Sequence, residues 1–474
     1  MNQHLWSGRF DSAPDPDAFD FGISFPFDRR LFEDDVTGSM AWAEALAACG
    51  ALTGEDAAAI QRGLAAILED GRRDPAWVNG PDEDVHSFVE RELVARVGDA
   101  GRRLHSGRSR NEQVSLDLRL YLRRRIPALQ SKLRDLIEAL ANQAEAAGEA
   151  VMPSYTHMRR AMPVLVAHFL LSHAAALRRD HDRLAAASAE ADALPLGSGA
   201  IAGTAYAIDV DRLAAHLGFS RVVSNSIDAA ADRDFAASFV YGCAMAMVHL
   251  SRIAEDFILM TSEEFGFFEL ADRSATGSSM MPQKKNPDPL ELVRGKAGRA
   301  VGRLTGLLVT MKGLPTGYNK DLQEDKEAVF DSEDTLSVSL VATRAVISHL
   351  TLGTERSRLA ASGLLLATDV ADYLAARGMP FRDAHQVVGR IVRELLAAGR
   401  SFDGLTLDEW RSYSGHFGDD IRAAVTPEAS VRARRTPQST SPAAVREALA
   451  QTRQWLVESS KLKVQSSSLE NPMD

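Results

Sequence analysis

Residues 126–144 read IPALQSKLRDLIEALANQA, and their apolar positions set the expected architecture. These positions recur at steps of three and four: Leu129, Leu133, Leu136, Ile137, Leu140 and Ala144. Because an α-helix has about 3.6 residues per turn, side chains at such steps lie on one face. The stretch therefore predicts a long helix whose apolar face packs against other helices.

Four further stretches between residues 112 and 361 repeat this spacing, at 164–177, 239–260, 293–311 and 336–350. Five long helices with apolar faces predict an all-α fold built on a long-helix bundle. Several of them are apolar over more than a narrow stripe, which favours packing against further copies of the chain. A large core within a single monomer is the alternative that periodicity leaves open.

Composition divides the chain into segments. We expect an N-terminal helical domain over 1–111, the central bundle domain over 112–361 and a small helical domain over 362–459, where the apolar periods are shorter. Residues 460–474 are polar and rich in serine, so we expect a flexible tail there.

The overall composition is that of an acidic protein. The 474 residues include 54 Lys and Arg against 65 Asp and Glu, a formal net charge of -11, which disfavours nucleic acid or an anionic membrane as a general partner. Cys49 and Cys243 lie among small apolar residues and predict free thiols in a reducing compartment. Residues 1–10 lack the basic and apolar regions of a secretory signal, so we expect a cytoplasmic location.

Residues 277–287 read GSSMMPQKKNP and carry the most chemistry in the chain. Pro282 and Pro287 keep the middle of this segment out of regular structure. A loop that brings a hydroxyl, an ammonium and an amide together can bind a carboxylate and exchange a proton with the same substrate. The pattern resembles the signature loop of the fumarase/aspartase superfamily, and its Lys-Lys-Asn spelling is most similar to the argininosuccinate lyase family.

The resemblance implies roles for residues of this loop and just beyond it. Ser278 matches the serine that takes part in proton transfer, and Lys284 and Asn286 match positions that hold a substrate carboxylate. Glu291 matches a carboxylate that pairs with the catalytic histidine of the family. An acid in the first turn of a helix is also favoured by the helix dipole, and Glu291 can serve both purposes.

Residues 153–158 read PSYTHM and contain the candidate histidine. A histidine before a helix is more often a capping or packing residue than a catalyst. The Tyr-Thr-His triplet, however, resembles the second motif of the family, which implies His157 as general acid or base and Thr156 as a hydrogen-bond donor to the substrate. A carboxylate partner would fix the tautomer of His157 and raise its basicity.

Further segments are charged and polar. Residues 105–113 read HSGRSRNEQ and by themselves indicate a basic helix start with Ser109 as its cap. Residues 318–326 by themselves indicate a charged helix start. Two N-terminal stretches, Asp84-Val85-His86 and Ser24 with the Phe-Asp-Arg-Arg-Leu that follows, are by themselves more often structural than functional. The resemblance implies that these segments bind substrate through Ser24, Asp84, Ser109, Arg110, Asn111, Tyr318, Gln323 and Lys326.

Taken together, these residues suit the elimination of an amine from an N-substituted aspartate. Removing the proton beside a carboxylate creates a dianionic aci-carboxylate, which Lys284, Asn286 and loop amides would stabilise. We favour Ser278 as the base, with His157 and Glu291 supporting acid transfer, and the reverse assignment of serine and histidine stays open. The reaction requires no metal or organic cofactor, and the sequence contains no ligand spacing that predicts one.

The resemblance extends over nearly the whole chain, from residues 5–10 to the C-terminal helices. It implies a bundle of the fumarase/aspartase type with three helical domains. It also implies a homotetramer in which each active site draws segments from three chains. The expected small-molecule substrate is argininosuccinate, cleaved reversibly to fumarate and L-arginine.

Departures from the family pattern concern the amine side of the substrate: Arg159, Met162, Gln438 and Ser439. A lyase for another N-substituted aspartate, such as ethylenediamine-disuccinate (EDDS) lyase, is therefore the alternative. The Ser-Arg-Asn segment at residues 109–111 and the Gln-Glu-Asp-Lys segment at residues 323–326 count against aspartase, fumarase and adenylosuccinate lyase. A non-catalytic, crystallin-like structural protein is the alternative of another class.

Overall fold

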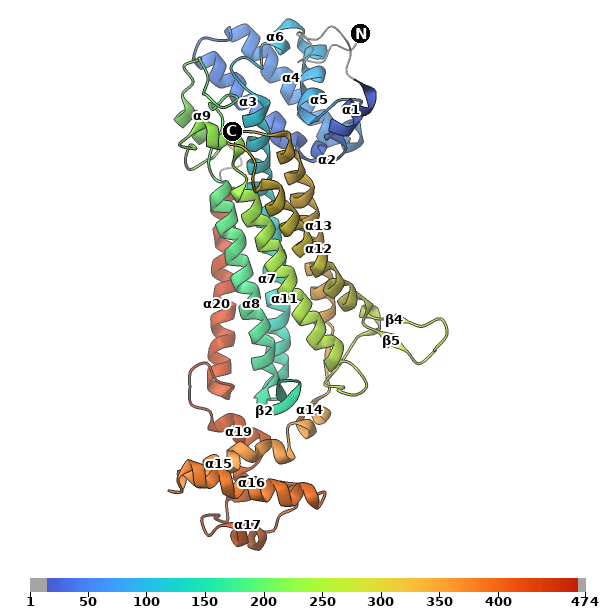
Figure 1. The fold of residues 1–474 in the computed structure, drawn as a ribbon, viewed down its shortest axis with the longest axis vertical. Helices are drawn as coiled ribbons and strands as arrows, with labels where there is room; N and C mark the ends of the chain where they lie inside the picture. The colour runs from blue at the N-terminus through green and yellow to red at the C-terminus, as the bar shows by residue number, and fades with distance from the viewer. Residues whose placement is uncertain (1–14, 468–474) are drawn as a thin grey trace. The chain divides into compact units, whose positions relative to one another are not determined.

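The computed structural model describes residues 15–467, and helices dominate this part of the chain (Figure 1). Residues 5–10, where the family resemblance begins, lie outside the described residues. The helices are α1 (Pro16–Gly22), α2 (Phe25–Asp28), α3 (Phe32–Ala48), α4 (Gly54–Arg73), α5 (Val85–Val97), α6 (Asp99–Arg102), α7 (Arg110–Ala147), α8 (Val166–Ala191), α9 (Val210–His216), α10 (Ser226–Ala231), α11 (Asp234–Met260), α12 (Asp288–Met311), α13 (Asp325–Ile347), α14 (Thr354–Ala360), α15 (Ala367–Ala376), α16 (Phe381–Ala397), α17 (Leu407–Tyr413), α18 (Ile421–Ala424), α19 (Pro427–Ala433) and α20 (Pro442–Ser467).

The predicted long-helix class is confirmed, because the five predicted helices are present as α7, α8, α11, α12 and α13. α20 is a further long helix near the C-terminus. It continues to Ser467, so helix extends into the segment expected to be a tail.

Short antiparallel strand pairs are the feature that apolar spacing did not predict. The pairs are β1 (Val151–Thr156) with β2 (Arg159–Leu165), β3 (Phe268–Glu269) with β6 (Thr351–Leu352), and β4 (Thr276–Gly277) with β5 (Lys285–Asn286). The helix expected from residue 164 is therefore wrong for its first two residues, since α8 begins at Val166. Val164 and Leu165 instead pair with Met152 and Val151 across the hairpin.

Two compact units make up the described chain. Unit 1 contains the residues up to Leu129 together with Asp182–Ala244 and Arg299–Asp334, and unit 2 contains Gln130–His181, Met245–Gly298 and the residues from Thr335 onward. The boundaries between these units fall inside the five long helices. The division at residues 111 and 361 therefore stays a prediction about sequence segments.

Unit 1 packs α3, α4 and α5 into a common core. The rings of Phe32, Trp77 and Phe88 meet edge to face, with centroids no more than 6.4 Å apart. Trp42 is fully buried and its indole donates to the carbonyl of Ser106 at 3.2 Å. This core fixes the starts of α5 and α7, which carry several of the predicted site residues.

Unit 2 contains the remaining parts of the long helices and the C-terminal helices. Gln143 on α7 donates to the carbonyl of Ile347 at 2.9 Å, and His249 on α11 pairs with Asp180 on α8 at 2.7 Å. α11 is long and apolar enough to cross a membrane by length and composition alone, but 61% of its most apolar window is buried, which is the pattern of a core helix. A separate apolar cluster around Trp410 holds α15 to α18 together.

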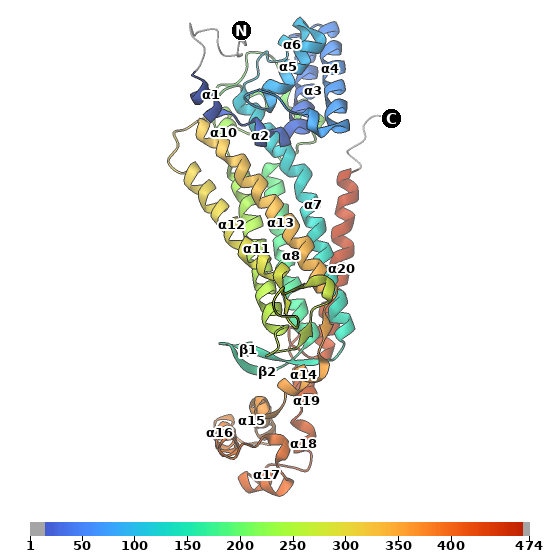
Figure 2. The same cartoon turned by 90° about the vertical axis from the view of Figure 1, so that its right-hand side faces the viewer.

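Two hairpins of unit 2 carry segments that the sequence analysis singled out. Figure 1 shows the β4–β5 hairpin and its connecting loop standing away from the helices of this unit. Figure 2 shows β1 and β2 running side by side to a free tip. Both hairpins present their turns to the outside of unit 2.

Much of the circumference of α12 is exposed. Its exposed apolar side chains include Leu292, Val301, Leu308 and Val309. A Cβ added at any of four glycines would meet no atom within 4 Å, and these glycines follow one another at steps of three or four: Gly295, Gly298, Gly302 and Gly306. Such spacing leaves a smooth strip along the helix on which another surface can pack closely.

Candidate functional site

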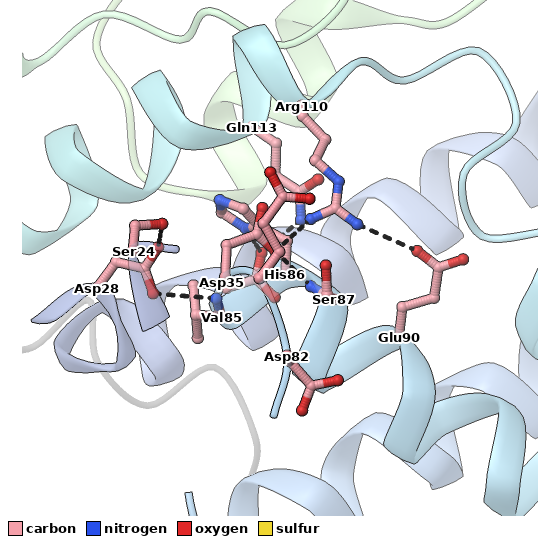
Figure 3. Close-up of polar contacts among 12 residues, drawn as sticks. Ser24, Asp28, Asp35, Asp82, Val85, His86, Ser87, Glu90, Arg110 and Gln113 are labelled. Atoms are coloured by element: carbon pink, nitrogen blue, oxygen red, sulfur yellow. Dashed lines mark hydrogen bonds and ion pairs between the residues drawn. The ribbon is translucent and has the colours of Figure 1, made fainter. Parts of the chain in front are cut away.

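Ser24 lies at the start of α2 in unit 1, and its hydroxyl is already engaged (Figure 3). The hydroxyl donates to Asp28 Oδ2, and Asp28 Oδ1 accepts the amide of Val85 at 3.0 Å. Burial raises the pKa of Asp28, although His86 and the bond from Ser24 act in the opposite direction. This pair ties α2 to the first turn of α5.

Asp84 caps the N-terminus of α5 and binds Arg110. Its Oδ1 accepts the amide of Ser87 at 2.7 Å and lies 2.6 Å from Arg110 Nη1. Burial would raise the pKa of Asp84, but Arg110, His86 and the Ser87 amide outweigh it, so the pKa is lowered. Arg110 Nη2 also lies 3.8 Å from Glu90 Oε2, and Figure 3 shows the two side chains facing each other. Asp84 is therefore an anion that orients a guanidinium.

The first turn of α7 brings together three predicted residues. Ser109 Oγ accepts the amide of Asn111 at 3.2 Å, which confirms Ser109 as the cap of this helix. The Ser109 amide donates to Glu112 Oε1 at 3.1 Å, and Asn111 Nδ2 donates to the carbonyl of Ala200 at 3.4 Å. Burial raises the pKa of Glu112 to about 7, against the opposing effect of backbone amides that include that of Ser109.

Lys326 is a buried cation at the start of α13. It is 2% exposed, and its Nζ lies 2.9 Å from Asp325 Oδ1. The other oxygen of Asp325 pairs with Arg233. Burial would raise the pKa of Asp325, but Lys326 and Arg233 outweigh it and the pKa is lowered. One carboxylate between two cations leaves an excess positive charge, which suits a carboxylate ligand.

The remaining predicted residues of unit 1 lie in the segment before α13. Gln323 Nε2 donates to the carbonyl of Gly22 at 3.3 Å. Tyr318 is half-buried, and burial raises its pKa, with Arg233 opposing that rise and Asp84 adding to it. These contacts connect this segment to the end of α1 and to the start of α5.

Contacts of the predicted residues of unit 1 thus join α2 to α5, α5 to α7, and the segment before α13 to the end of α1. Sequence reasoning missed three residues that bind the predicted residues or their partners: Asp28, Arg233 and Asp325. Two of them could have been predicted from their positions in the sequence, because Asp28 follows Ser24 by one helical turn and Asp325 is adjacent to Lys326. Arg233 could not be predicted in this way, because it is far in the sequence from its partner Asp325.

His157 lies at the tip of the β1–β2 hairpin in unit 2, and the expectation that it precedes a helix is wrong. His157 and Met158 have φ of 53° and 57°, the left-handed region that few residues other than glycine adopt. A two-residue hairpin turn requires such angles, and each costs about 1 kcal/mol or more in a non-glycine residue. Thr156 pairs with Arg159 across the turn, and all four side chains are exposed.

A shallow cavity of about 310 Å³ adjoins this hairpin tip. Aromatic and thioether groups form part of its wall, and two guanidinium groups and one carboxylate face it. Its lining residues are Tyr155, Met158, Arg159, Arg160, Glu264 and Phe265. Arg159, one of the departures from the family pattern, thus lies beside the predicted acid–base residue.

Ser278 begins the loop between β4 and β5. Its Oγ accepts the amide of Met280 at 3.2 Å and that of Met281 at 3.0 Å. Two amides directed at one hydroxyl oxygen stabilise negative charge on it, which a serine base requires.

The other predicted residues of this hairpin differ in exposure. Lys284 is exposed, and its neighbour Lys285 pairs with Asp272 at 2.8 Å. Asn286 is half-buried in β5, opposite Thr276. Lys284 is therefore the cation of this hairpin that is not engaged in an ion pair within the described chain.

Glu291 lies in the first turn of α12 and is exposed. The expected pair between Glu291 and His157 is not formed within residues 15–467, where no hydrogen bond or ion pair joins these two side chains. Both groups therefore present unused polar atoms at the surface of unit 2.

Sequence profiles of known families match most of the chain. The profile described as "Lyase" matches residues 8–302, and the profile described as "Argininosuccinate lyase C-terminal" matches residues 364–432. The argininosuccinate lyase of Desulforudis audaxviator (strain MP104C) is 47% identical over 453 residues, which cover 95% of this chain and 99% of that protein. That of Roseiflexus castenholzii (strain DSM 13941 / HLO8) is 47% identical over 454 residues, which cover 96% and 100%.

Solved structures share the architecture. A variant of EDDS lyase with bound fumarate is 27% identical with a TM-score of 0.83, and the match covers 97% of this chain and 93% of that chain. A class II fumarase from Schistosoma mansoni has a TM-score of 0.73 at 15% identity, over 85% of this chain and 90% of that chain, which shows the fold alone.

Proposed function

Because this chain belongs to the argininosuccinate lyase family of the fumarase/aspartase superfamily, we propose that it cleaves argininosuccinate into fumarate and L-arginine. One observation carries this proposal: 47% identity extends over 95% of the chain and 99% of the Desulforudis relative. A match of that extent includes residues of both units, so the proposal does not depend on a single motif.

The reaction is the elimination of an amine from an N-substituted aspartate. A base takes the proton from the carbon beside a carboxylate, and the electron pair spreads into that carboxylate. This electron pair then forms the C=C double bond of fumarate while the C–N bond breaks, and the electrons of the C–N bond leave with the amine nitrogen. Since this C–H bond is very weakly acidic, fixed donors must meet the charge as it develops.

Groups of unit 2 perform the proton transfers in this proposal. Ser278 is the base, and the amides of Met280 and Met281, which donate to its oxygen, support its charge. Lys284 and Asn286 bind the carboxylate that receives the electron pair. His157, oriented by Glu291, protonates the departing nitrogen, with Thr156 donating a hydrogen bond to the substrate.

Groups of unit 1 bind the substrate in this proposal. Arg110, held by Asp84 at 2.6 Å, offers a fork of two N–H groups to a carboxylate, and Asn111 and Ser109 lie beside it in the first turn of α7. The excess positive charge at Lys326 serves the same purpose. Ser24, Tyr318 and Gln323 complete the set of polar contacts.

The test is direct. Purified protein is incubated with argininosuccinate, and the ultraviolet absorbance of fumarate is followed over time. We expect fumarate to accumulate in step with arginine. A flat trace from protein that is folded by circular dichroism would contradict the proposal and favour the crystallin-like alternative.

EDDS lyase is the second candidate, because an EDDS lyase has a TM-score of 0.83 with this chain. The chemistry is the same and the amine differs. Rates measured side by side with argininosuccinate and EDDS decide between them. We expect argininosuccinate to react faster, since identity is 47% to the argininosuccinate lyases and 27% to EDDS lyase.

We further propose a homotetramer whose active sites are shared between subunits. The open strip of glycines on α12 supports it, and so do Glu291 and His157, because the described residues of one chain do not cover the strip or pair with these two side chains. In Gly302→Phe, a ring on this strip should dissociate the assembly in analytical ultracentrifugation and abolish turnover. A wild-type monomer with full activity would contradict the proposal.

A cytoplasmic location is proposed on the state of the two cysteines. Cys49 and Cys243 are both free thiols, and burial raises the pKa of Cys243 well above its usual value. Free thiols are typical of a reducing compartment. Fractionation of the source cells, with activity followed in each fraction, checks this location.

A further inference from the structure

Three buried side chains from three helices of unit 1 meet behind the first turn of α5. Asp35 on α3, His86 on α5 and Asp117 on α7 are each no more than 4% exposed. His86 Nδ1 lies 2.8 Å from Asp35 Oδ1 and 3.4 Å from Asp117 Oδ2. Figure 3 shows His86 and Asp35 next to Gln113, close to the site groups Ser24 and Arg110. The proposed function assigns no role to Asp35 or Asp117.

This cluster contains more acceptors than donors. Asp35 Oδ1 accepts from Gln113 Nε2 and faces His86. Asp35 Oδ2 and both oxygens of Asp117, in contrast, are buried without a hydrogen-bond partner among the described residues. Burying two adjacent carboxylates with unpaired oxygens is costly, so a proton or a cation must lie between them.

The charges around the cluster favour a proton over a metal ion. In geometry the three side chains could surround a cation, since their ligand atoms lie within 4.8 Å of one another. Arg108, however, is itself buried, interacts with both Asp35 and Asp117, and donates to Ser39 Oγ at 3.1 Å. A divalent ion beside this guanidinium would be repelled, whereas one proton neutralises one carboxylate and leaves the other to balance Arg108.

We propose that Asp117 is protonated and that its carboxyl O–H donates a hydrogen bond to Asp35 Oδ2. This acid pair positions His86 and, through His86, the first turn of α5. Asp35 then remains a carboxylate that holds His86 by its other oxygen. Because His86 lies two residues after Asp84, fixing the imidazole also fixes the carboxylate that orients Arg110. Asp35 and Asp117 are positioning residues, since they act on the site through His86.

The assignment of the proton to Asp117 follows from its surroundings. Burial and the charges of Asp35 and Asp34 raise the pKa of Asp117 well above its usual value, with Arg108 opposing them. Burial also acts to raise the pKa of Asp35, but His86, Arg108 and Gln113 outweigh it and the pKa is lowered. Asp35, which has these charged and hydrogen-bonding partners, therefore carries the negative charge of the pair.

The matched pair of variants Asp117→Asn and Asp35→Asn tests the proposal. An asparagine at 117 still donates a hydrogen bond to Asp35, so kcat/KM should stay within about threefold of wild type. An asparagine at 35 removes the anion that holds His86, and kcat/KM should fall by roughly tenfold to a hundredfold, as for other orienting partners of functional histidines. The double variant should be no worse than Asp35→Asn alone, because the shared proton is already lost.

A second measurement does not depend on turnover. The infrared difference spectrum between wild type and Asp117→Asn should contain the C=O band of one protonated carboxylic acid. The difference spectrum between wild type and Asp35→Asn should contain it as well, because the shared proton is lost in both variants. The kinetic comparison rests on the proposed function, whereas the infrared band does not, so an inactive protein with the band would contradict only the proposed function.

Three results would overturn the proposal. One is equal loss of kcat/KM in both single variants while their urea-unfolding midpoints match that of wild type. Another is the absence of the acid band from the wild-type spectrum. The third is a stoichiometric metal ion in the purified protein that is lost in Asp117→Asn, which would assign the space between the carboxylates to a cation.

Discussion

The two units present their polar residues in opposite ways. In unit 1, Ser24, Asp84, Arg110 and Lys326 are paired within the chain and mostly buried. In unit 2, His157, Lys284 and Glu291 are exposed on hairpins or at a helix start and have no such partners among residues 15–467. The proposed binding groups are therefore preorganised by the fold, while the proposed proton-transfer groups would be completed by a neighbouring subunit in the proposed tetramer.

This difference matches the two tasks. A carboxylate-binding group gains affinity when its geometry is set before the ligand arrives, because less ordering is required on binding. A proton-transfer group must approach a carbon that first has to enter the site, and closure around the substrate then excludes water. We therefore expect substitutions in unit 1 to lower stability and those in unit 2 to lower turnover.

The largest expected effect is on turnover, in Ser278→Ala and His157→Asn. Positioned acids and bases contribute roughly 10²- to 10⁴-fold to rates, so kcat should fall by a factor in that range in each variant. Steady-state assays of fumarate release measure it. Because Ser278 accepts only loop amides and His157 is exposed, the circular dichroism spectrum and unfolding midpoint should not change.

Wild-type turnover in either variant would remove that residue from the proposed chemistry. Ser279→Ala is the matched control for Ser278→Ala, since it removes a hydroxyl from the same loop without touching the proposed base. We expect kcat of this control to stay close to that of wild type.

Substitutions of Lys326 in unit 1 and of Lys284 in unit 2 test the difference between the units directly. Lys326→Met leaves the buried Asp325 with one cation instead of two, and breaking a buried pair costs about 3–5 kcal/mol, so the free energy of unfolding in urea should fall by that amount. Lys284→Met changes an exposed loop residue and should alter stability by no more than about 0.5 kcal/mol. It should nonetheless reduce kcat/KM, because the developing charge loses a cation.

If Lys284→Met were the more destabilising variant of the two, the contrast between the units would be wrong. Arg110→Met offers an independent check within unit 1. It should raise KM and leave Asp84 without its cation.

Glu112 predicts how stability in unit 1 depends on pH. Its folded pKa of about 7 lies above the usual value of 4.5, so the folded state binds this proton more tightly than the unfolded state does. The contribution to stability is complete below pH 4.5 and is lost as the pH rises through 7. Glu112→Gln should remove that loss, so the unfolding free energy of the variant should rise relative to wild type by about 3 kcal/mol across this window.

Urea titrations at several pH values between 4 and 8 measure this difference. A difference that is constant with pH would show that Glu112 has the same affinity for its proton in the folded and unfolded states.

The smallest expected effect is at the tip of the β1–β2 hairpin. Met158 has φ of 57°, which glycine adopts without the Cβ clash, so Met158→Gly should stabilise unit 2 by about 1 kcal/mol. Thr156→Gly, in the adjoining strand, should instead destabilise it by a similar amount. A shift of the unfolding midpoint in the same direction for both variants would contradict this account of the turn.

Sequence periodicity predicted the long helices because each buries a continuous face, and burial at steps of three and four is visible along the chain. The β1–β2 hairpin was not visible, since the left-handed angles of His157 and Met158 occur in residues that carry no turn signal. Motifs predict Ser278 and Lys326 as site residues, whereas the partner that Arg233 gives to Asp325 left no local pattern, because this ion pair joins distant segments. The excess of buried acceptors around Asp117 became visible only when three helices were brought together.

The glycines along α12 have a consequence for handling the protein. Each glycine destabilises a helix by about 1 kcal/mol relative to alanine, and in the proposed tetramer a neighbouring subunit packed on this helix would offset that cost. Association then acts as a ligand of the folded state, and resistance to heat or urea should increase with protein concentration. Dilution should therefore lower the stability of the folded chain. Activity lost on standing at nanomolar concentration should return when the sample is concentrated again.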